Sequence, residues 1–310
     1  MSLDDAELRL DALTRQWVVV AGHRQGRPNL PAGDCPFCVG GLEAPEPYAA
    51  RAFPNRWSVL TPGAPLDAAL GAASGVEVLP GRGAAEVVLY SPDHDASLAS
   101  IGVGGARAVV DVWAERTAAL LARPEVAYVL VFENRGREVG ATIDHPHGQL
   151  YGFPFVPPVP AREADVAATH GCAVCAELRR EASTPIRVVV EHPGWLAWVP
   201  YASGWPFGML LAPRQHLGLL SELTSEERTG LAAALVDALG CYDRLFDAPF
   251  PYMLWVHQSP GMHLHVHVAP PRRGADALRH VAAGEVGSGT LFNPVTPEVA
   301  AEQLRAAARR

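Results

Sequence analysis

Short apolar runs alternate with longer stretches of helical periodicity along the sequence. Valine-rich runs of strand length cover residues 126–132 and 187–190, and a further apolar run covers residues 252–257. Apolar positions recur at the spacing of an amphipathic helix over residues 106–121 and 226–239. Because β-branched runs favour buried strands and a period near 3.6 favours helices, the pattern predicts a mixed α+β fold.

Local signals predict two helix starts and one connector. Thr224 and Glu227 have capping-box spacing, in which the two side chains satisfy backbone N–H groups of the first turn. Thr296 before Pro297 predicts the start of a C-terminal helix, since proline is tolerated at the first helical position. The proline-rich residues 153–160 predict an extended connector, because proline fixes φ and lacks an N–H group.

The same series of landmarks occurs twice along the chain. Each series has a Cys-x-x-Cys pair, a tryptophan, a histidine shortly after a proline, and a His-x-His pair. The separations between equivalent positions are 137, 138, 122 and 118 residues, so they change only where loops are expected. We interpret this as a duplicated unit, with predicted domains at 1–158 and 159–310. The equivalent positions are Cys38 and Cys175, Trp57 and Trp195, His94 and His216, and His145 and His263.

Composition and charge exclude several classes of function. The chain has 25 Lys and Arg residues, all of them arginine, so Schiff-base lysines and the P-loop lysine are excluded. Its net charge is −8 and it has no arginine-rich run, so we expect no nucleic-acid partner. It has no uninterrupted run of 18 apolar residues and no signal-peptide core, so we expect a cytoplasmic protein without a membrane partner.

Cysteine and histidine spacing in the first half predicts a zinc site. Two thiolates and two imidazoles form a tetrahedral zinc set, and strands can bring distant histidines to a Cys-x-x-Cys turn. A lone pair of cysteines with this spacing is more often a reduced, buried pair, but its repetition favours metal. With four protein ligands the site would be closed, and therefore structural. The predicted ligands are Cys35, Cys38, His94 and His145.

The second half offers two possible metal sets. The duplication predicts a second Cys2His2 set at positions equivalent to those of the first. One carboxylate and three imidazoles form a competing set that suits iron or zinc. The residues alone leave this choice open. The first set is Cys172, Cys175, His216 and His263, and the competing set is Glu163, His257, His265 and His267.

The run His-Pro-His-Gly-Gln at 145–149 carries candidate catalytic residues. In a strand, alternate residues share a face, so His145, His147 and Gln149 would line one surface and Gly148 would allow close approach. If His145 turns back to a metal, His147 is left to face the substrate. A neutral His147 imidazole can attack phosphorus and split one displacement into two. Gln149 can stabilise charge on a non-bridging oxygen but cannot supply a proton, which suits a phosphate leaving group. A half-buried polar strand without catalytic function is the alternative.

Further polar residues are candidates for substrate binding. Arg24 and Arg27 stand three positions apart before the first cysteine pair, where they could clamp phosphates. Asn55, Asn134 and Thr142 lie in segments with many glycines and prolines close to the predicted site. These residue types indicate an anionic substrate.

At this point the motifs resemble those of a known family. The run from Phe132 to Gly136 together with 140–149 is similar to the signature of galactose-1-phosphate uridylyltransferases, a branch of the histidine-triad superfamily. Supporting matches span most of the chain. They lie at residues 11–20, 23–28, 35–38, 91–94, 205–207 and 265–267.

The resemblance implies two tandem histidine-triad-like units joined into one half-barrel-like subunit. It also implies a ping-pong reaction, in which UDP-glucose gives UMP to His147 with release of glucose-1-phosphate, and galactose-1-phosphate then takes UMP to form UDP-galactose. Gln149 would stabilise the uridylylated histidine. Members are commonly homodimers whose active sites borrow residues from the partner chain. Relatives with a second cysteine pair resemble this chain at the set of Cys172, Cys175, His216 and His263. The resemblance therefore favours this set for the second metal, with zinc rather than iron as the ion.

Two other functions are compatible with the sequence. A related ADP-glucose phosphorylase resembles the same motifs but usually has serine where Gly148 stands, which favours the uridylyltransferase. A non-catalytic, zinc-stabilised nucleotide-binding protein would use the histidines only as ligands. The segment 279–285 matches the family's sugar-binding region but lacks the lysine that several members have there, and Cys241 reads as a small buried residue.

Overall fold

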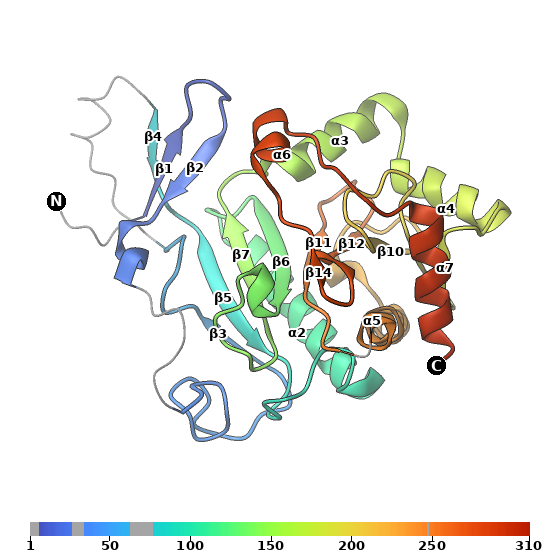
Figure 1. Cartoon of the computed structure of the whole chain (residues 1–310). Helices are drawn as coiled ribbons and strands as arrows, with labels where there is room; N and C mark the ends of the chain where they lie inside the picture. Colours follow the sequence, from blue (N-terminus) through green and yellow to red (C-terminus); the bar gives the residue numbers. More distant parts are fainter. Residues whose placement is uncertain (1–5, 27–33, 63–76, 247) are drawn as a thin grey trace.

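One antiparallel sheet passes through both halves of the chain (Figure 1). The computed structural model describes residues 6–26, 34–62, 77–246 and 248–310. Within these ranges the sheet has nine strands, in the order β3-β5-β7-β6-β11-β12-β10-β9-β8. Their bounds are β3 Arg51–Pro54, β5 Ala84–Leu89, β6 Tyr128–Arg135, β7 His147–Phe153, β8 Val188–His192, β9 Trp195–Trp198, β10 Met209–Pro213, β11 Tyr252–His257 and β12 His265–Ala269.

The strand order repeats about the centre of the sheet. The first half reads β3-β5-β7-β6 from its edge, and the second reads β9-β10-β12-β11 once its additional edge strand β8 is set aside. The halves join where β6 pairs with β11, with Phe132 opposite Trp255. The expected α+β class with antiparallel units is confirmed, and the units share one open sheet that does not close into a barrel. The domain boundary after residue 158 stays a prediction.

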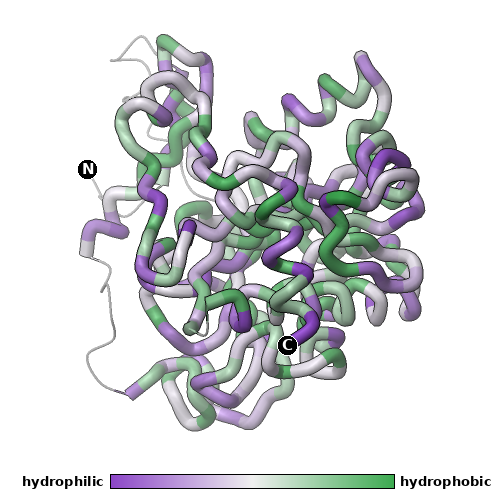
Figure 2. Tube along the Cα trace, turned by 45° about the vertical axis from the view of Figure 1, so that its right-hand side comes forward, coloured by the Kyte–Doolittle hydropathy of each residue, from purple (hydrophilic) through white to green (hydrophobic). Residues whose placement is uncertain are grey.

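Two long helices cover one face of the sheet. The helices α2 (Gly102–Leu121) and α5 (Ser225–Leu245) pack together on one face. The predicted apolar strands pack against these helices and complete the core. Trp113 of α2 and Leu235 of α5 are fully buried in it, as are Val131 of β6 and Val256 of β11. Hydrophobic segments therefore run through the middle of the molecule, while hydrophilic segments lie mostly at its periphery (Figure 2). The remaining elements are β1 Glu7–Leu10, β2 Trp17–Val20, β4 Val78–Pro80, α3 Pro158–His170, α4 Ala173–Ser183, β13 Arg272–Gly274, β14 Ala277–Leu278, α6 Ala283–Ser288, α7 Pro297–Ala308 and the short 3-10 turns η1 Gly22–Gly26, η2 Arg137–Val139 and η3 Leu220–Glu222.

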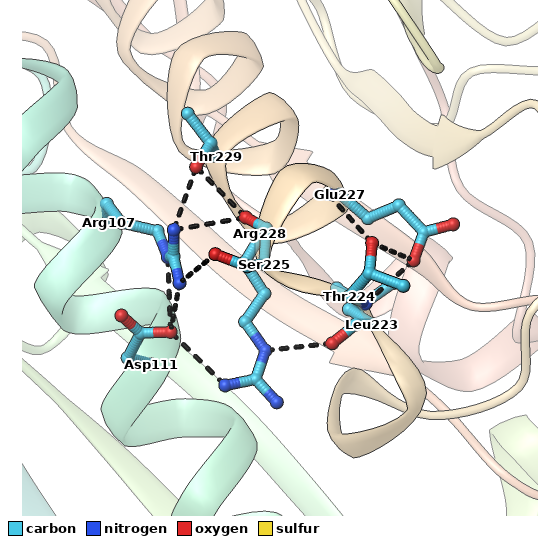
Figure 3. Close-up of polar contacts among 8 residues, drawn as sticks. All are labelled: Arg107, Asp111, Leu223, Thr224, Ser225, Glu227, Arg228 and Thr229. Carbon is cyan, nitrogen blue, oxygen red and sulfur yellow. Dashed lines mark hydrogen bonds and ion pairs between the residues drawn. The ribbon is translucent and has the colours of Figure 1, made fainter.

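A polar network connects α2 with the start of α5 (Figure 3). Asp111 accepts from Arg107 at 3.1 Å and from Arg228 at 3.2 Å. Arg107 also donates to the carbonyl of Ser225 at 3.0 Å and to the Thr229 hydroxyl at 2.8 Å. Because Arg107 and Arg228 come from different halves and share one carboxylate, the network ties the halves together.

The predicted helix starts are confirmed, and the connector is shorter than expected. The Thr224 hydroxyl accepts from the Glu227 amide at 3.2 Å, and the Glu227 carboxylate accepts from the Thr224 amide at 2.7 Å. The C-terminal helix begins at Pro297. The extended connector predicted for 153–160 was wrong beyond Pro157, because α3 begins at Pro158, and prolines of a first helical turn have no N–H partner to lose. Among the described residues, no helix is long and apolar enough to cross a membrane.

Candidate active site and metal centres

Strand β7 places His147 and Gln149 on the face of the sheet opposite α2 and α5. Alternate residues of a strand point to opposite faces, so Leu150 is fully buried in the core on the other side. Gln149 lies between Val87 of β5 and Phe132 of β6. The predicted strand position is therefore correct for His147 and Gln149, whereas His145 lies before the strand, which begins at His147.

A hydrogen bond fixes the imidazole of His147. Its Nδ1 lies 2.7 Å from the carbonyl oxygen of His145. A carbonyl can only accept, so Nδ1 carries the proton and Nε2 carries the lone pair. The ring of Phe37 packs edge-on against the His147 ring, with centroids 5.1 Å apart. The imidazole is thus held in one tautomer and one orientation, with its lone pair on Nε2.

The side chain of Gln149 is oriented by its neighbours. Its Oε1 accepts from Asn55 Nδ2 at 3.1 Å and from the Tyr151 hydroxyl at 3.4 Å. Asn55 is itself held, because its Oδ1 accepts from the Trp57 amide at 2.9 Å. With both contacts on the oxygen, the NH2 group of Gln149 is the part that can donate to a ligand.

A cavity of about 590 Å³ opens over His147 and Gln149. Asn55 and Thr142 line it, as the sequence predicted. A smaller cavity of about 60 Å³ also reaches His147, and Asn134 lines that one. Four of the predicted side chains therefore gather around His147.

Of the predicted arginine clamp, the structure describes only Arg24. Arg24 lies on η1 and is not among the described residues that line either cavity. Arg27 lies outside the described residues. Phe37 was missed by the sequence analysis, although its place between two predicted zinc ligands was a signal that it lies near His145 and His147.

The first metal set is assembled as predicted. Its four ligand atoms lie within 4.8 Å of one another. Cys38 Sγ lies 3.5 Å from His94 Nδ1 and 3.7 Å from His145 Nδ1. A tetrahedral zinc with ordinary bond lengths separates sulfur from nitrogen by about 3.5 Å, so the donors fit this ion. The complete set is Cys35, Cys38, His94 and His145.

The outer contacts of His145 support a role as a ligand. Its Nε2 donates to the Ser91 carbonyl at 2.8 Å, which leaves the Nδ1 lone pair facing Cys38. The Tyr48 hydroxyl lies 2.8 Å from the same Nε2. Burial lowers the pKa of His145, and this keeps the ring in the neutral form that binds metal.

The second Cys2His2 set repeats this arrangement. Cys175 Sγ lies 3.4 Å from His216 Nδ1 and 3.3 Å from His263 Nδ1. His263 Nε2 donates to the Pro213 carbonyl at 2.8 Å, as His145 does to Ser91. Burial lowers the pKa of His263 to about 4. The complete set is Cys172, Cys175, His216 and His263.

The Glu-His set is also assembled, from other residues. Glu163 of α3 lies 2.8 Å from His257 Nδ1, 3.5 Å from His265 Nε2 and 3.8 Å from His267 Nε2. Burial alone would raise the pKa of Glu163, but hydrogen bonds from His257 and His265 lower it well below its ordinary value. The two sets of the second half share no residue, so the structure accommodates both where the sequence analysis treated them as competing.

Comparisons with known proteins agree along nearly the whole chain. The family models for the galactose-1-phosphate uridyl transferase N-terminal and C-terminal domains match residues 40–157 and 165–309. A galactose-1-phosphate uridylyltransferase of Thermotoga maritima is 37% identical, over 96% of this chain and 98% of the relative. A solved uridylyltransferase structure matches with a TM-score of 0.87 at 32% identity, covering 98% of both chains. An ADP-glucose phosphorylase from Arabidopsis thaliana, solved with ADP-glucose, matches with a TM-score of 0.71 at 25% identity, covering 97% of this chain and 98% of that one.

Proposed function

Because the chain belongs to the galactose-1-phosphate uridylyltransferase family of nucleotidyltransferases, we propose that it transfers UMP from UDP-glucose to galactose-1-phosphate through a uridylylated His147. The observation that carries the proposal is the fixed tautomer of His147. The carbonyl of His145 holds the proton on Nδ1, which places the lone pair on Nε2. The same residue lines a cavity large enough for a nucleotide sugar.

In the first half-reaction, Nε2 of His147 attacks the phosphorus atom of the UMP group. An N–P bond forms, the P–O bond to glucose-1-phosphate breaks, and that phosphate leaves with the electron pair. In the second half-reaction, a phosphate oxygen of galactose-1-phosphate attacks the same phosphorus and His147 leaves. A phosphate needs no proton to depart, which suits a site where residue 149 is a glutamine, whose carboxamide cannot supply one.

Gln149 stabilises the charge on the non-bridging oxygens during both steps. Its NH2 group donates to them, while Asn55 holds its carbonyl oxygen at 3.1 Å. Asn134 and Thr142, together with Arg24 and Arg27, bind the nucleotide and its phosphates in this proposal. The family resemblance supports these assignments, and the cavity lining supports those for Asn134 and Thr142.

Zinc in the two Cys2His2 sets would stabilise the fold. Each set offers four protein ligands, so a bound ion would have no open position for a substrate. The Glu163 set offers three nitrogens and one carboxylate, a donor set that suits zinc or iron. We propose further that the protein works as a cytoplasmic homodimer. Exposed apolar side chains on and beside α6, such as Val286 and Phe292, support a contact with a partner chain.

An ADP-glucose phosphorylase is the second candidate, because a solved enzyme of that activity covers 97% of this chain. Nucleotide chromatography of two reaction mixtures separates the candidates. Our proposal expects UDP-galactose and glucose-1-phosphate from UDP-glucose and galactose-1-phosphate. Double-reciprocal plots of initial rate against the concentration of one substrate, at several concentrations of the other, should be parallel. ADP formed from ADP-glucose and phosphate, without the first conversion, would favour the phosphorylase. No conversion in either mixture would favour a non-catalytic, zinc-stabilised binding protein.

A further inference from the structure

Gly148 stands between the two candidate catalytic residues and contacts Tyr90 on the core side of the sheet. We propose that Tyr90 is a positioning residue, whose buried ring restricts position 148 to glycine and so sets the depth of β7 and the places of His147 and Gln149. The inference rests on the proposed function, since it concerns the same site.

The space around Gly148 is closed by Tyr90. A Cβ atom added at position 148 would lie 2.0 Å from the Tyr90 hydroxyl oxygen and 2.8 Å from the adjacent ring carbon. The carbonyl oxygen of Phe132 would lie at 3.0 Å on another side. A Cβ atom does not approach a non-bonded atom as closely as the two Tyr90 distances, so any side chain at 148 must displace either Tyr90 or the strand.

The ring of Tyr90 has little room to move. The residue is 1% exposed, and its ring packs edge-on against Trp113 of α2 with centroids 5.9 Å apart. Its backbone amide donates to the Pro146 carbonyl at 3.1 Å. One residue therefore contacts the chain directly before and directly after His147, through its backbone and its ring.

Because Tyr90 is enclosed, a side chain at 148 would also press on strand β7, and any movement of the strand would carry the reactive groups with it. His147 and Gln149 flank Gly148, so a shift of the backbone there changes the position of His147 Nε2 and of the Gln149 NH2 group together. A misplacement of about 1 Å can lower the rate of an enzymatic step by about 100-fold. It also follows that serine at 148 would need a smaller residue at position 90, because its Cβ would meet the Tyr90 ring in the same way.

A double-mutant cycle tests the inference. The variants are Gly148→Ala, Tyr90→Phe, Tyr90→Leu and the two combinations, each mixed with UDP-glucose in single-turnover experiments that follow the His147 adduct by mass spectrometry. We expect Gly148→Ala alone to slow adduct formation by about 10- to 100-fold. The same change should cost less than about 3-fold in the Tyr90→Leu background, with an intermediate loss beside Tyr90→Phe, which removes only the 2.0 Å contact.

Equal losses in all three backgrounds would overturn the inference, as would a Gly148→Ala variant that reacts within twofold of the unaltered protein. Melting temperatures of the same proteins separate this result from a failure of the proposed function. If the unaltered protein forms no adduct, the proposed function fails. The melting temperatures still test the steric contact between residues 148 and 90 in that case. The contact requires the losses of Gly148→Ala and Tyr90→Leu to be non-additive in the double variant.

Discussion

Replacing Glu133 by glutamine should raise the free energy of unfolding at alkaline pH, relative to the unaltered protein. The same replacement should change this free energy less at acidic pH. Glu133 lies on the core face of β6 and is 4% exposed. Its Oε1 accepts from the Tyr252 hydroxyl at 3.1 Å, and its Oε2 is buried without a hydrogen-bond partner among the described residues. Burial raises the pKa of Glu133 to about 7, against the opposing effects of Tyr252 and Arg135.

The sign and size of the effect follow from this raised pKa. The folded chain binds the proton more tightly than the unfolded chain, so the associated stability is complete below about pH 4.5 and is lost as the pH rises through about 7. Since each tenfold change in proton affinity is worth about 1.4 kcal/mol, the full loss is about 3 kcal/mol. Between about pH 5.5 and pH 8.5 the loss is about 2 kcal/mol.

Urea denaturation of the unaltered protein and Glu133→Gln at these two pH values measures the difference. The free energy of unfolding of the variant, relative to the unaltered protein, should rise by about 2 kcal/mol from the lower to the higher pH. Glu302→Gln, which changes an exposed carboxylate of α7, should show no comparable rise. A pH-independent difference for Glu133→Gln would refute the reasoning, because it would mean that Glu133 does not titrate between the two pH values.

Three further predictions concern the contact between the halves, the metal and the orientation of Gln149. Asp111→Asn should lower the free energy of unfolding by about 1 kcal/mol, and an unchanged urea midpoint would show that the α2–α5 network adds nothing. Cys38→Ser should remove one metal ion per chain by plasma mass spectrometry, whereas the buried Cys241→Ser should keep the full content, and equal contents would contradict the ligand assignment. Asn55→Ala should slow adduct formation about fivefold by releasing Gln149, and an unchanged single-turnover rate would exclude this orienting role.

The elements with strong local signals were predictable from the sequence. The period of residues 226–239 and the capping pair Thr224 and Glu227 predicted α5, because local hydrogen bonds and one apolar stripe determine such a helix. The duplicated landmarks predicted two similar units, and the strand order of one half recurs in the other. The joining of the halves through β6 and β11 was not predictable, because the register of strands distant in sequence depends on packing that no local pattern encodes.

The candidate site was predictable where residue type alone determines the chemistry. Cysteine and histidine spacing gave both Cys2His2 sets, since few other roles demand that combination. The contact of Phe37 with His147 and the closure of Gly148 by Tyr90 were not predictable, because aromatic residues are usual in any core. The sequence analysis also treated the group of Glu163 and the group of Cys172 as alternatives. Only the fold shows that both groups are assembled, from different residues.

The most direct test of the proposed function is the mass of the intact protein after mixing with UDP-glucose. We predict a gain of one UMP, which galactose-1-phosphate removes. The gain should be absent in His147→Ala and retained in His170→Ala, which changes an exposed histidine at the end of α3. An unaltered protein that gains no mass, or a His147→Ala variant that still gains UMP, would contradict the assignment of His147 as the nucleophile.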